Sequence, residues 1–309
     1  MAATLLETAR QYAAQQDFLA AAIVRYYAES SEVLRLLQFS DISGNAISYD
    51  VLESMPDVGF RAINEGYSES TAVWKKEMEA LMIAGGDLDV DVALVSMFPE
   101  SDLRTQQELF KVRALSLAWT TAFFKGMNSA DGRQMNGLQV RLGDEENELV
   151  INGNGALSLT NLDRLISRVD NPTHLFMDEE LKLKLQAASR NTDIAGFITF
   201  TPDEFGRQVV RYQGLPIIGL KNDNARRRIL GFTESNPKGS GNNFTSVYCV
   251  AFRPMGLVGI QNKPIEVRRL GEINDKPAFR SRVEWYSSFA MFSNCAARLM
   301  GISDNYVVA

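Results

Sequence analysis

The residues best suited to chemistry are scarce in this sequence. His174 is the single histidine among 309 residues, and Cys249 and Cys295 are the only cysteines. A Ser-His-Asp triad, a metal site built from several histidines and a histidine pH switch have little material here. His174 lies in an apolar stretch typical of a core strand, and both cysteines are best interpreted as small buried hydrophobes. We therefore predict no catalytic residue and no metal ligand.

Two glycine-rich segments could cradle a phosphate. Gly153 and Gly155 form a Gly-x-Gly after a predicted strand, but the third glycine of a dinucleotide fingerprint is missing and Ser158 follows instead. Gly239-Ser240-Gly241 has no lysine behind it, so the pattern of a phosphate loop is incomplete. A plain turn and a surface loop explain these segments better. No carboxylate pairs with a recognisable catalytic partner, so the sequence predicts no cofactor and no enzyme activity.

The charge balance argues against a protein that grips nucleic acid over a wide face. The chain carries 32 basic and 38 acidic side chains, a net charge of -6. Proteins that neutralise many phosphates normally show the opposite sign. The densest basic run is Arg226-Arg227-Arg228. It could contact nucleic acid or the carboxylates of a neighbouring subunit, and a solvated loop is an equally good interpretation.

Length and composition indicate an ordinary folded protein of about two domains. Hydrophobic residues make up 45% of the chain and charged residues 23%, which excludes a disordered or low-complexity polypeptide. Neither end carries an apolar stretch long enough for a membrane span or a signal peptide, so we expect a cytoplasmic protein with no membrane partner. Two cysteines are too few for a disulfide framework.

The N-terminal segment has the pattern of an amphipathic helical arm. From Thr4 to Gln38, apolar residues recur at three- and four-residue steps, which predicts one stripe along a helix. Gln16 and Ser30 fall on that stripe, so the helix is expected to be broken or only partly buried. Such an arm needs a surface to lie on, and packing on its own core is favoured over packing on a neighbour.

A long hairpin is predicted after the arm. Segments 46–51 and 58–63 alternate at period two, 64–70 is a polar turn, and 71–78 can return as a strand. Both strands carry charges and few consecutive large apolar residues, so neither suits the centre of a core. A long half-polar hairpin is marginal in water by itself. Such a hairpin would be stable if it packed on another subunit.

A long helix is predicted over 100–125. Ser101 or Asp102 can cap its first turn, and Gly126 stands where a C-terminal glycine is expected. Its wide apolar face indicates packing on more than one side. That face comprises Phe110, Ala114, Leu117, Thr121 and Phe124, with Leu115, Trp119 and Phe123 alongside. Beyond this helix, strands alternate with helices as in an α/β lobe, and the C-terminal segment is rich in strands.

The order of these elements resembles that of the tailed-bacteriophage major capsid proteins, which have the Hong Kong 97-like fold. The resemblance covers nearly the whole chain, and the order of its motifs is more specific than any motif alone. Similar stretches are Phe123–Gly126 with Met135–Leu138 at the exit of the family's spine helix, Tyr212–Ile218 in a strand pair of its axial domain, and Leu270–Ile273, Lys276-Pro277 and Val283–Tyr286 in its closing strands.

The resemblance implies an α+β, Hong Kong 97-like capsid fold with four parts. These are an N-terminal arm at 1–44, an extended hairpin loop at 45–84, a peripheral domain at 85–154 and 263–309 with the spine helix at 100–125, and an α/β axial domain at 155–262. Arm and hairpin would find on neighbouring subunits the core that they lack. The subunit-interface residues we predict are Arg61, Glu65, Tyr67, Trp74, Lys75, Arg226, Arg227 and Arg228.

The resemblance also implies a structural role. Such subunits form pentamers and hexamers that close into an icosahedral shell around double-stranded phage DNA, so the expected location is the virion, assembled in the host cytoplasm. Expected partners are further copies of the chain, a portal protein and DNA held by weak non-specific contact, which suits the negative net charge. Because the helical arm follows Met1 directly, we expect a separate scaffolding protein, or none, instead of a fused one.

Two other functions fit parts of the sequence. An encapsulin-like bacterial compartment has a similar fold and would enclose a cargo enzyme instead of DNA. A cytosolic α/β enzyme would act through the loops near Gly153 or Gly239, but the single histidine and the unsupported hairpin count against it. The contents of a purified particle separate a compartment from a capsid, and a discrete small particle would favour the enzyme.

Overall fold

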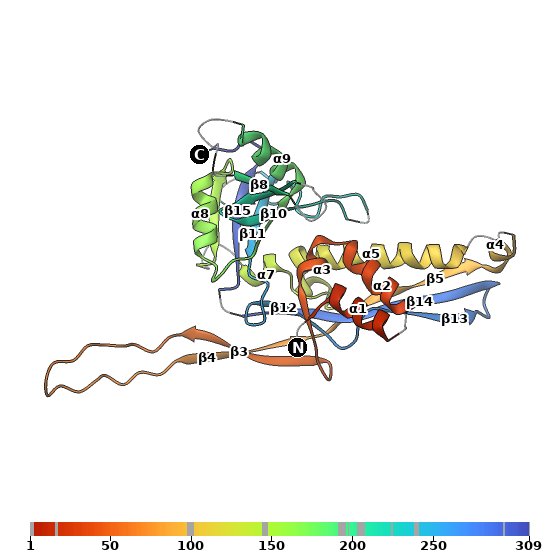
Figure 1. Cartoon of the computed structure of the whole chain (residues 1–309), viewed down its shortest axis with the longest axis horizontal. Coiled ribbons are helices and arrows are strands. Elements are labelled where there is room, and N and C mark those ends of the chain that lie inside the picture. The colour runs from red at the N-terminus through yellow and green to blue at the C-terminus, as the bar shows by residue number, and fades with distance from the viewer. Residues whose placement is uncertain are drawn as a thin grey trace.

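A projecting hairpin, a long helix on a sheet and a second lobe make up the molecule (Figure 1). The computed structural model describes residues 3–15, 18–97, 102–143, 148–190, 196, 198–202, 208–223, 225–237, 241–292 and 294–308. The hairpin leaves the body at one end, while the long helix lies along the sheet toward the other end (Figure 1). The second lobe carries its own sheet and helices. The overall shape is therefore elongated.

One sheet of six strands supports the long helix. Its strands are β1 (Ala3–Thr4), β2 (Gln38–Asp41), β5 (Met82–Asp91), β12 (Leu257–Gln261), β13 (Glu266–Glu272) and β14 (Ala278–Met291). The order is β1-β2-β12-β14-β13, and β5 also pairs with β14. The β5–β14 ladder is antiparallel and runs from Met82 opposite Ser287 to Asp91 opposite Ala278. This long ladder forms the stiff base of the body.

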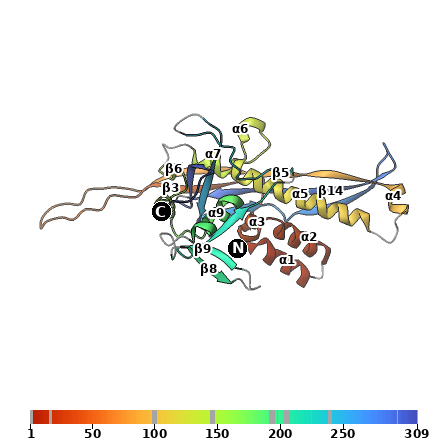
Figure 2. The same ribbon diagram turned by 90° about the horizontal axis from the view of Figure 1, so that it is seen from above.

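The spine helix α5 (Leu103–Lys125) confirms the predicted long helix (Figure 2). Asp102 caps it by accepting a hydrogen bond from the Thr105 N–H (3.0 Å), while Ser101 lies outside the described residues. The predicted apolar face is only partly correct, because Phe110 is exposed and Glu108 is buried. The first turns of the helix face β13 and β14 through polar side chains, and only the last turns enter the aromatic core.

The N-terminal segment packs on the spine helix of its own subunit (Figure 2). Its helical prediction is confirmed, and so is the expected break. The segment forms α1 (Leu5–Ala14), α2 (Phe18–Glu29) and α3 (Glu32–Leu36), with Ser30 between α2 and α3; Gln16 lies outside the described residues. Ser31 caps α3 and contacts the Thr120 hydroxyl of α5 at 2.6 Å. The expectation that the arm packs on its own core is confirmed, and the expectation that it finds its core on a neighbour is wrong. The apolar side chains buried here are Leu5, Ala9, Ala21, Val24, Tyr27, Ala28, Val33, Leu34 and Leu37.

Aromatic rings join the arm, the spine helix and the sheet into one core. The ring centre of Trp285 in β14 lies 5.0 Å from that of Tyr27, 5.2 Å from Phe39 and 5.5 Å from Trp119. The buried indole N–H of Trp119 donates to the Ser287 hydroxyl (3.0 Å). Because this polar group is satisfied, the ring is buried without the cost of a lost hydrogen bond.

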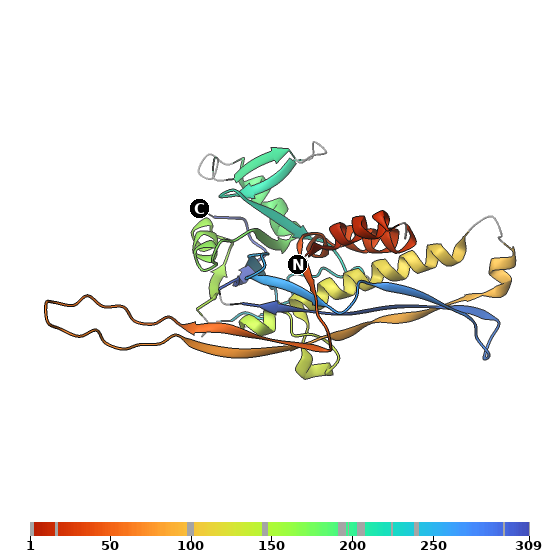
Figure 3. The same ribbon diagram turned by 60° about the horizontal axis from the view of Figure 1, so that its bottom comes forward.

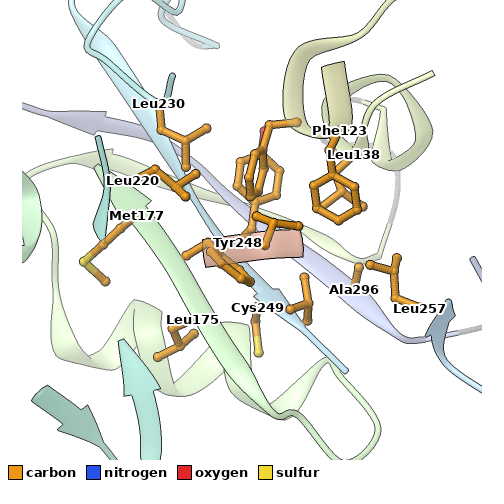
Figure 4. Packing of buried hydrophobic residues seen from close by; sticks show 14 of the residues in the cluster. Phe123, Leu138, Leu175, Met177, Leu220, Leu230, Tyr248, Cys249, Leu257 and Ala296 are labelled. Atoms are coloured by element: carbon orange, nitrogen blue, oxygen red, sulfur yellow. The ribbon is translucent and has the colours of Figure 1, made fainter. Parts of the chain in front are cut away.

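A seven-stranded sheet forms the second lobe. Its strands are β6 (Val150–Gly155), β7 (His174–Asp178), β8 (Ile198–Pro202), β9 (Gln208–Tyr212), β10 (Leu215–Leu220), β11 (Phe244–Val250) and β15 (Ala296–Ser303), in the order β6-β15-β11-β7-β10-β9-β8. Helix α8 (Leu159–Ser167) contacts β6 and β15, and α9 (Glu179–Ala188) contacts β7 and β10. Leu175, Tyr248 and Cys249 lie fully buried at its centre (Figure 4).

Strand pairing departs from the predicted domain boundaries at three places. Chain order assigns most of β6 to the segment 85–154 of the peripheral domain, but β6 pairs with β15 in the second sheet. Chain order assigns β12 to the axial segment 155–262, but β12 pairs with β14 and β2 in the six-stranded sheet. Chain order assigns β15 to the segment 263–309 of the peripheral domain, but β15 pairs with β11 and β6 in the second sheet. The chain crosses between the sheets after β11 and again after β14. Sequence order does not reveal where a strand finds its partner.

The predicted hairpin is confirmed in part (Figure 3). Strands β3 (Ala46–Ser54) and β4 (Val73–Ala80) contain most of the first and last predicted segments and pair antiparallel. The strand predicted at 58–63 is wrong, because residues 55–72 form an open loop. A segment whose polar and apolar residues alternate forms a β-strand only where a neighbouring strand can hydrogen-bond to it. Three short helices complete the described elements: α4 (Val92–Met97), α6 (Asn128–Asp131) and α7 (Leu138–Leu142).

A buried carboxylate clamps the first half of the spine helix to the sheet. Glu108 accepts hydrogen bonds from the Arg269 guanidinium (3.0 and 2.9 Å) and the Ser281 hydroxyl (2.6 Å), and Arg104 lies 3.5 Å away. The hydrogen bond to Glu108 raises the pKa of Arg269. The Glu108 side chain is 8% exposed, so the interior holds a charge that these donors compensate.

Replacing Glu108 with alanine is expected to destabilise the subunit by about 2–3 kcal/mol, because Arg104 and Arg269 lose their buried partner. Urea unfolding of the dissociated subunit measures this loss. Glu29→Ala is the matched control, since it removes an exposed ion pair with Arg25 on α2 and should cost less than about 0.5 kcal/mol. Equal losses in the two variants would contradict the clamp.

Candidate functional site: an exposed subunit interface

The hairpin extends away from the body (Figure 3), and residues 53–71 at its outer end are all exposed. Its ladder runs from Ala46 opposite Ala80 to Leu52 opposite Trp74, with an irregularity before Ser54. The first four residues of β4 are all exposed, so neither face of the ribbon is covered there. A two-stranded ribbon of this kind is marginally stable in water unless another surface covers it.

Large apolar side chains gather on the outer hairpin. Phe60 is fully exposed, Ile63 is 90% exposed and Trp74 is 62% exposed. Further exposed apolar residues of the hairpin are Met55, Val58, Tyr67, Val73 and Met78. Soluble monomers rarely leave a large contiguous apolar patch in water, and such patches mark sites of association. Tryptophan and tyrosine are also the residues that most often dominate binding energy in interfaces.

The hairpin tip brings three predicted interface residues together. The Arg61 guanidinium lies 5.2 Å from the centre of the Tyr67 ring and donates to the backbone C=O of Glu65 (3.2 Å). The Glu65 carboxylate accepts a hydrogen bond from the Ala62 N–H (3.0 Å). Asn64 adopts the left-handed conformation, φ 70°, that closes this turn. These contacts shape the tip locally and leave Tyr67 exposed.

Trp74 and Lys75 are adjacent on β4, where successive side chains point to opposite faces of the ribbon. Lys75 Nζ forms an exposed ion pair with Glu77 Oε1 at 2.6 Å, and this hydrogen bond raises the Lys75 pKa. An exposed pair of this kind adds little stability to the subunit. The two side chains are therefore available to a partner.

Arg228, the last residue of the basic run, is bound within its own subunit. Its guanidinium donates to the Asp178 carboxylate (2.8 Å) and to the Glu180 carboxylate. The Asp178 side chain is fully buried, and its burial raises its pKa while Arg228 acts in the opposite direction. Asp178 also caps α9 by accepting from the Glu180 N–H (3.0 Å). Arg228 therefore holds the loop after β10 against α9.

Arg226 and Arg227 remain at the surface. Arg227 pairs with Asp223 Oδ2 (3.2 Å), but its side chain is 79% exposed. It lines a cleft of about 440 Å³ between β5 and the last turns of α5. Arg226 is exposed and adopts a left-handed conformation, φ 60°. The eight predicted residues thus fall into two places, five on the hairpin and three on the loop after β10.

The hairpin root carries contacts that sequence analysis missed. Glu79 of β4 forms an ion pair with Arg141 of α7, and Tyr49 of β3 packs against Phe292 with ring centres 4.9 Å apart. Alternation at 46–51 placed Tyr49 in the ribbon, but Glu79 lies one residue beyond the predicted return segment 71–78. Their partners stand far away in the sequence, so no local pattern could identify them.

Desolvation keeps the single histidine and both cysteines in uncharged forms. Desolvation lowers the pKa of His174 to about 4 and raises those of Cys249 and Cys295 to about 12. A thiol with such a pKa is a poor nucleophile near neutral pH. In the described part of the chain, His, Cys, Asp and Glu side chains form no group of three or more that could hold a metal ion. The helices described there include none long and apolar enough to cross a membrane.

The glycine segments have plainer explanations than phosphate binding where the structure describes them. Gly153 lies inside β6, and a Cβ at this position would come within 2.2 Å of the Ile302 side chain. Close packing therefore explains the glycine. Gly239 and Ser240 lie outside the described residues.

Shell proteins are among the solved structures that share this fold. A chain of the holo-SrpI encapsulin complex from Synechococcus elongatus matches with a TM-score of 0.66 and 16% identity over 89% of this chain and 88% of that chain. A chain from Microbacterium phage Oxtober96 matches with a TM-score of 0.62 and 13% identity over 89% of this chain and 91% of that chain. A chain from the capsid of the native GTA particle matches with a TM-score of 0.62 and 11% identity, also over 89% of this chain and 91% of that chain.

These likenesses establish the fold. The chain has the α+β, Hong Kong 97-like fold that its sequence predicts. The sequence matches no protein-family model and no curated protein.

Trp74 is expected to be the tryptophan that solvent reaches in the dissociated subunit. The chain has three tryptophans, and Trp119 and Trp285 are only 4% and 1% exposed. Iodide should quench one component of the fluorescence, and Trp74→Phe should abolish that component. Quenching that persists unchanged in this variant would contradict the exposed position of Trp74.

Proposed function

We propose that this Hong Kong 97-fold chain is the major capsid (head) protein of a tailed bacteriophage, a structural subunit and not an enzyme. The observation that carries the proposal is the projecting hairpin, on which Phe60, Ile63 and Trp74 are exposed in the single subunit. The fold that the chain shares with an encapsulin and a capsid chain supports a role in forming a shell.

Burial of the hairpin supplies a driving force for self-association. Apolar surface removed from water contributes about 25 cal/mol per Å². The hairpin of one copy would cover a different surface of the next copy, which makes the contact heterologous. Heterologous contacts form closed rings when the rotation between copies permits. Pentamers and hexamers are such rings, and together they close an icosahedral shell.

The shell would enclose double-stranded DNA without binding it tightly. The net charge of -6 favours weak, non-specific contact with phosphates. Further partners in this proposal are a portal protein and either a separate scaffolding protein or none. The chain would assemble in the host cytoplasm and reside in the virion.

An encapsulin-like bacterial compartment is the second candidate. The similarity to the SrpI encapsulin, with a TM-score of 0.66, favours it. This function needs the same subunit contacts and differs in what the shell contains. A cytosolic enzyme has less support, because desolvation keeps His174 and both cysteines uncharged.

Trp74→Ala should leave the subunit folded and weaken assembly. Truncating a central interface tryptophan typically costs about 2 kcal/mol or more, which raises the concentration needed for assembly about thirtyfold. Light scattering at increasing protein concentration measures this threshold. Trp74→Phe keeps an aromatic side chain and should assemble near the wild-type threshold. Assembly of the alanine variant at the wild-type threshold would argue against a hairpin interface.

Particle contents distinguish the capsid from the compartment. Particles isolated from cells that naturally produce the chain are expected to hold nuclease-protected double-stranded DNA, measured by extraction and gel analysis. Mass spectrometry of the same particles identifies enclosed proteins. A shell without DNA that holds one cargo protein would overturn the capsid assignment and support the compartment.

A further inference from the structure

We infer that three side chains form a latch that fixes the direction in which the hairpin leaves the subunit, with Arg141 as the positioning residue. The inference rests on the proposed function, because direction matters only if the hairpin must reach a neighbouring copy. The root latch, as we call it, comprises Arg141, Glu79 and Tyr49.

An ion pair between Glu79 and Arg141 joins β4 to the body. The two side chains are 21% and 10% exposed. Solvent therefore screens this pair far less than the pair between Lys75 and Glu77 further out on the same strand, whose side chains are 64% and 39% exposed. Separating a largely buried pair leaves a charge without its partner, which is strongly unfavourable. The hairpin root is thus held to one place on α7.

The body holds Arg141 in position for this contact. Its Nε donates to the backbone C=O of Asn136 (2.7 Å), and its guanidinium lies 4.1 Å from the centre of the Phe289 ring in β14. The start of α7 is fixed to the end of the spine helix, where the Gly137 N–H donates to the Gly126 C=O (2.9 Å). A planar guanidinium can stack on a ring and donate from its edge at once, whereas a lysine ammonium cannot.

Tyr49 anchors the other strand of the hairpin. Its ring packs against Phe292, and its hydroxyl oxygen accepts a hydrogen bond from the Met291 N–H (3.3 Å). Burial raises the pKa of Tyr49. Tyr49 pairs with Glu77, two residues before Glu79, so Tyr49 and Glu79 share one face of the ribbon. Both strands are therefore fastened, through one face, next to the same end of β14.

A small change of angle at the hairpin root moves the hairpin tip by a large distance. An extended chain advances about 3.3 Å per residue, so Phe60 lies up to about 35 Å beyond Tyr49, and a tilt of about 10° at the root would move it by about 6 Å. Such a shift is larger than the contact distances of a packed interface. A loosened root would lower the fraction of subunits whose hairpin is oriented for binding, which weakens the apparent affinity.

Spin labels on the hairpin and the spine helix test the latch in the full chain. Glu53→Cys in β3 and Ala118→Cys in α5 place one label at an exposed position of the hairpin and the other at an exposed position of the spine helix. The native Cys249 and Cys295 are buried and should not react. Pulsed electron–electron double resonance on the dissociated subunit then gives the distribution of distances between the label on the hairpin and the label on the body.

Glu79→Gln and Arg141→Lys should each broaden this distribution about twofold or more, because the root is freed. Glu77→Gln is the matched control: it makes the same change on the same strand, but its cation partner belongs to the hairpin, so the distribution should stay as in the wild type. An unchanged width in both latch variants, or equal broadening in the control, would overturn the inference. Circular dichroism verifies that each variant is folded.

Assembly kinetics separate failure of the latch from failure of the proposed function. With the latch variants, the initial rate of light scattering should fall about fivefold or more, because fewer subunits hold the hairpin in the binding orientation, and the Glu77→Gln control should match the wild type. Broader distributions with wild-type kinetics would overturn the positioning role and leave the shell function standing. If the wild type never assembles, the proposed function fails, while the distance distributions still decide whether the latch exists.

Discussion

A two-stranded ribbon cannot bury its own two faces, and the rest of this structure depends on that constraint. The outer hairpin exposes Phe60, Ile63 and Trp74, yet its root is fastened to the body through Tyr49 and Glu79. Folding therefore ends with a surface whose apolar area can be removed from water only by another molecule. In the proposed assembly, a single contact would both stabilise the hairpin and associate the subunits.

The body supplies the rigidity that such a contact requires. The ring of Trp285 ties the N-terminal helices to the spine helix and the sheet, and the carboxylate of Glu108 ties the other half of the spine helix to β13 and β14. The N-terminal segment contributes to this core and packs on its own subunit. The hairpin projects away from the body (Figure 3), so in the proposed shell it would carry the interface.

Local patterns predicted the parts of the fold that are local. Helical periodicity identified the arm and the spine helix, and element order led to the fold class. Long-range partners were out of reach, as shown by Glu108 with Arg269 and by Glu79 with Arg141, which stand far apart in the sequence. The candidate site shows the same limit. The run of three arginines at 226–228 is apparent in the sequence, but only the fold shows that Arg228 binds carboxylates of its own subunit. The alternation of polar and apolar residues at 58–63 describes the segment's polarity alone. It carries no information on whether another strand pairs with the segment.

Negative-stain electron microscopy of the full chain expressed by itself, with size-exclusion chromatography to estimate mass, tests the central claim of self-assembly most directly. Closed shells or rings of subunits with masses far above the 34.4 kDa of one chain are the predicted result. A chain that stays a folded monomer or dimer at every protein concentration and salt condition tried would contradict it.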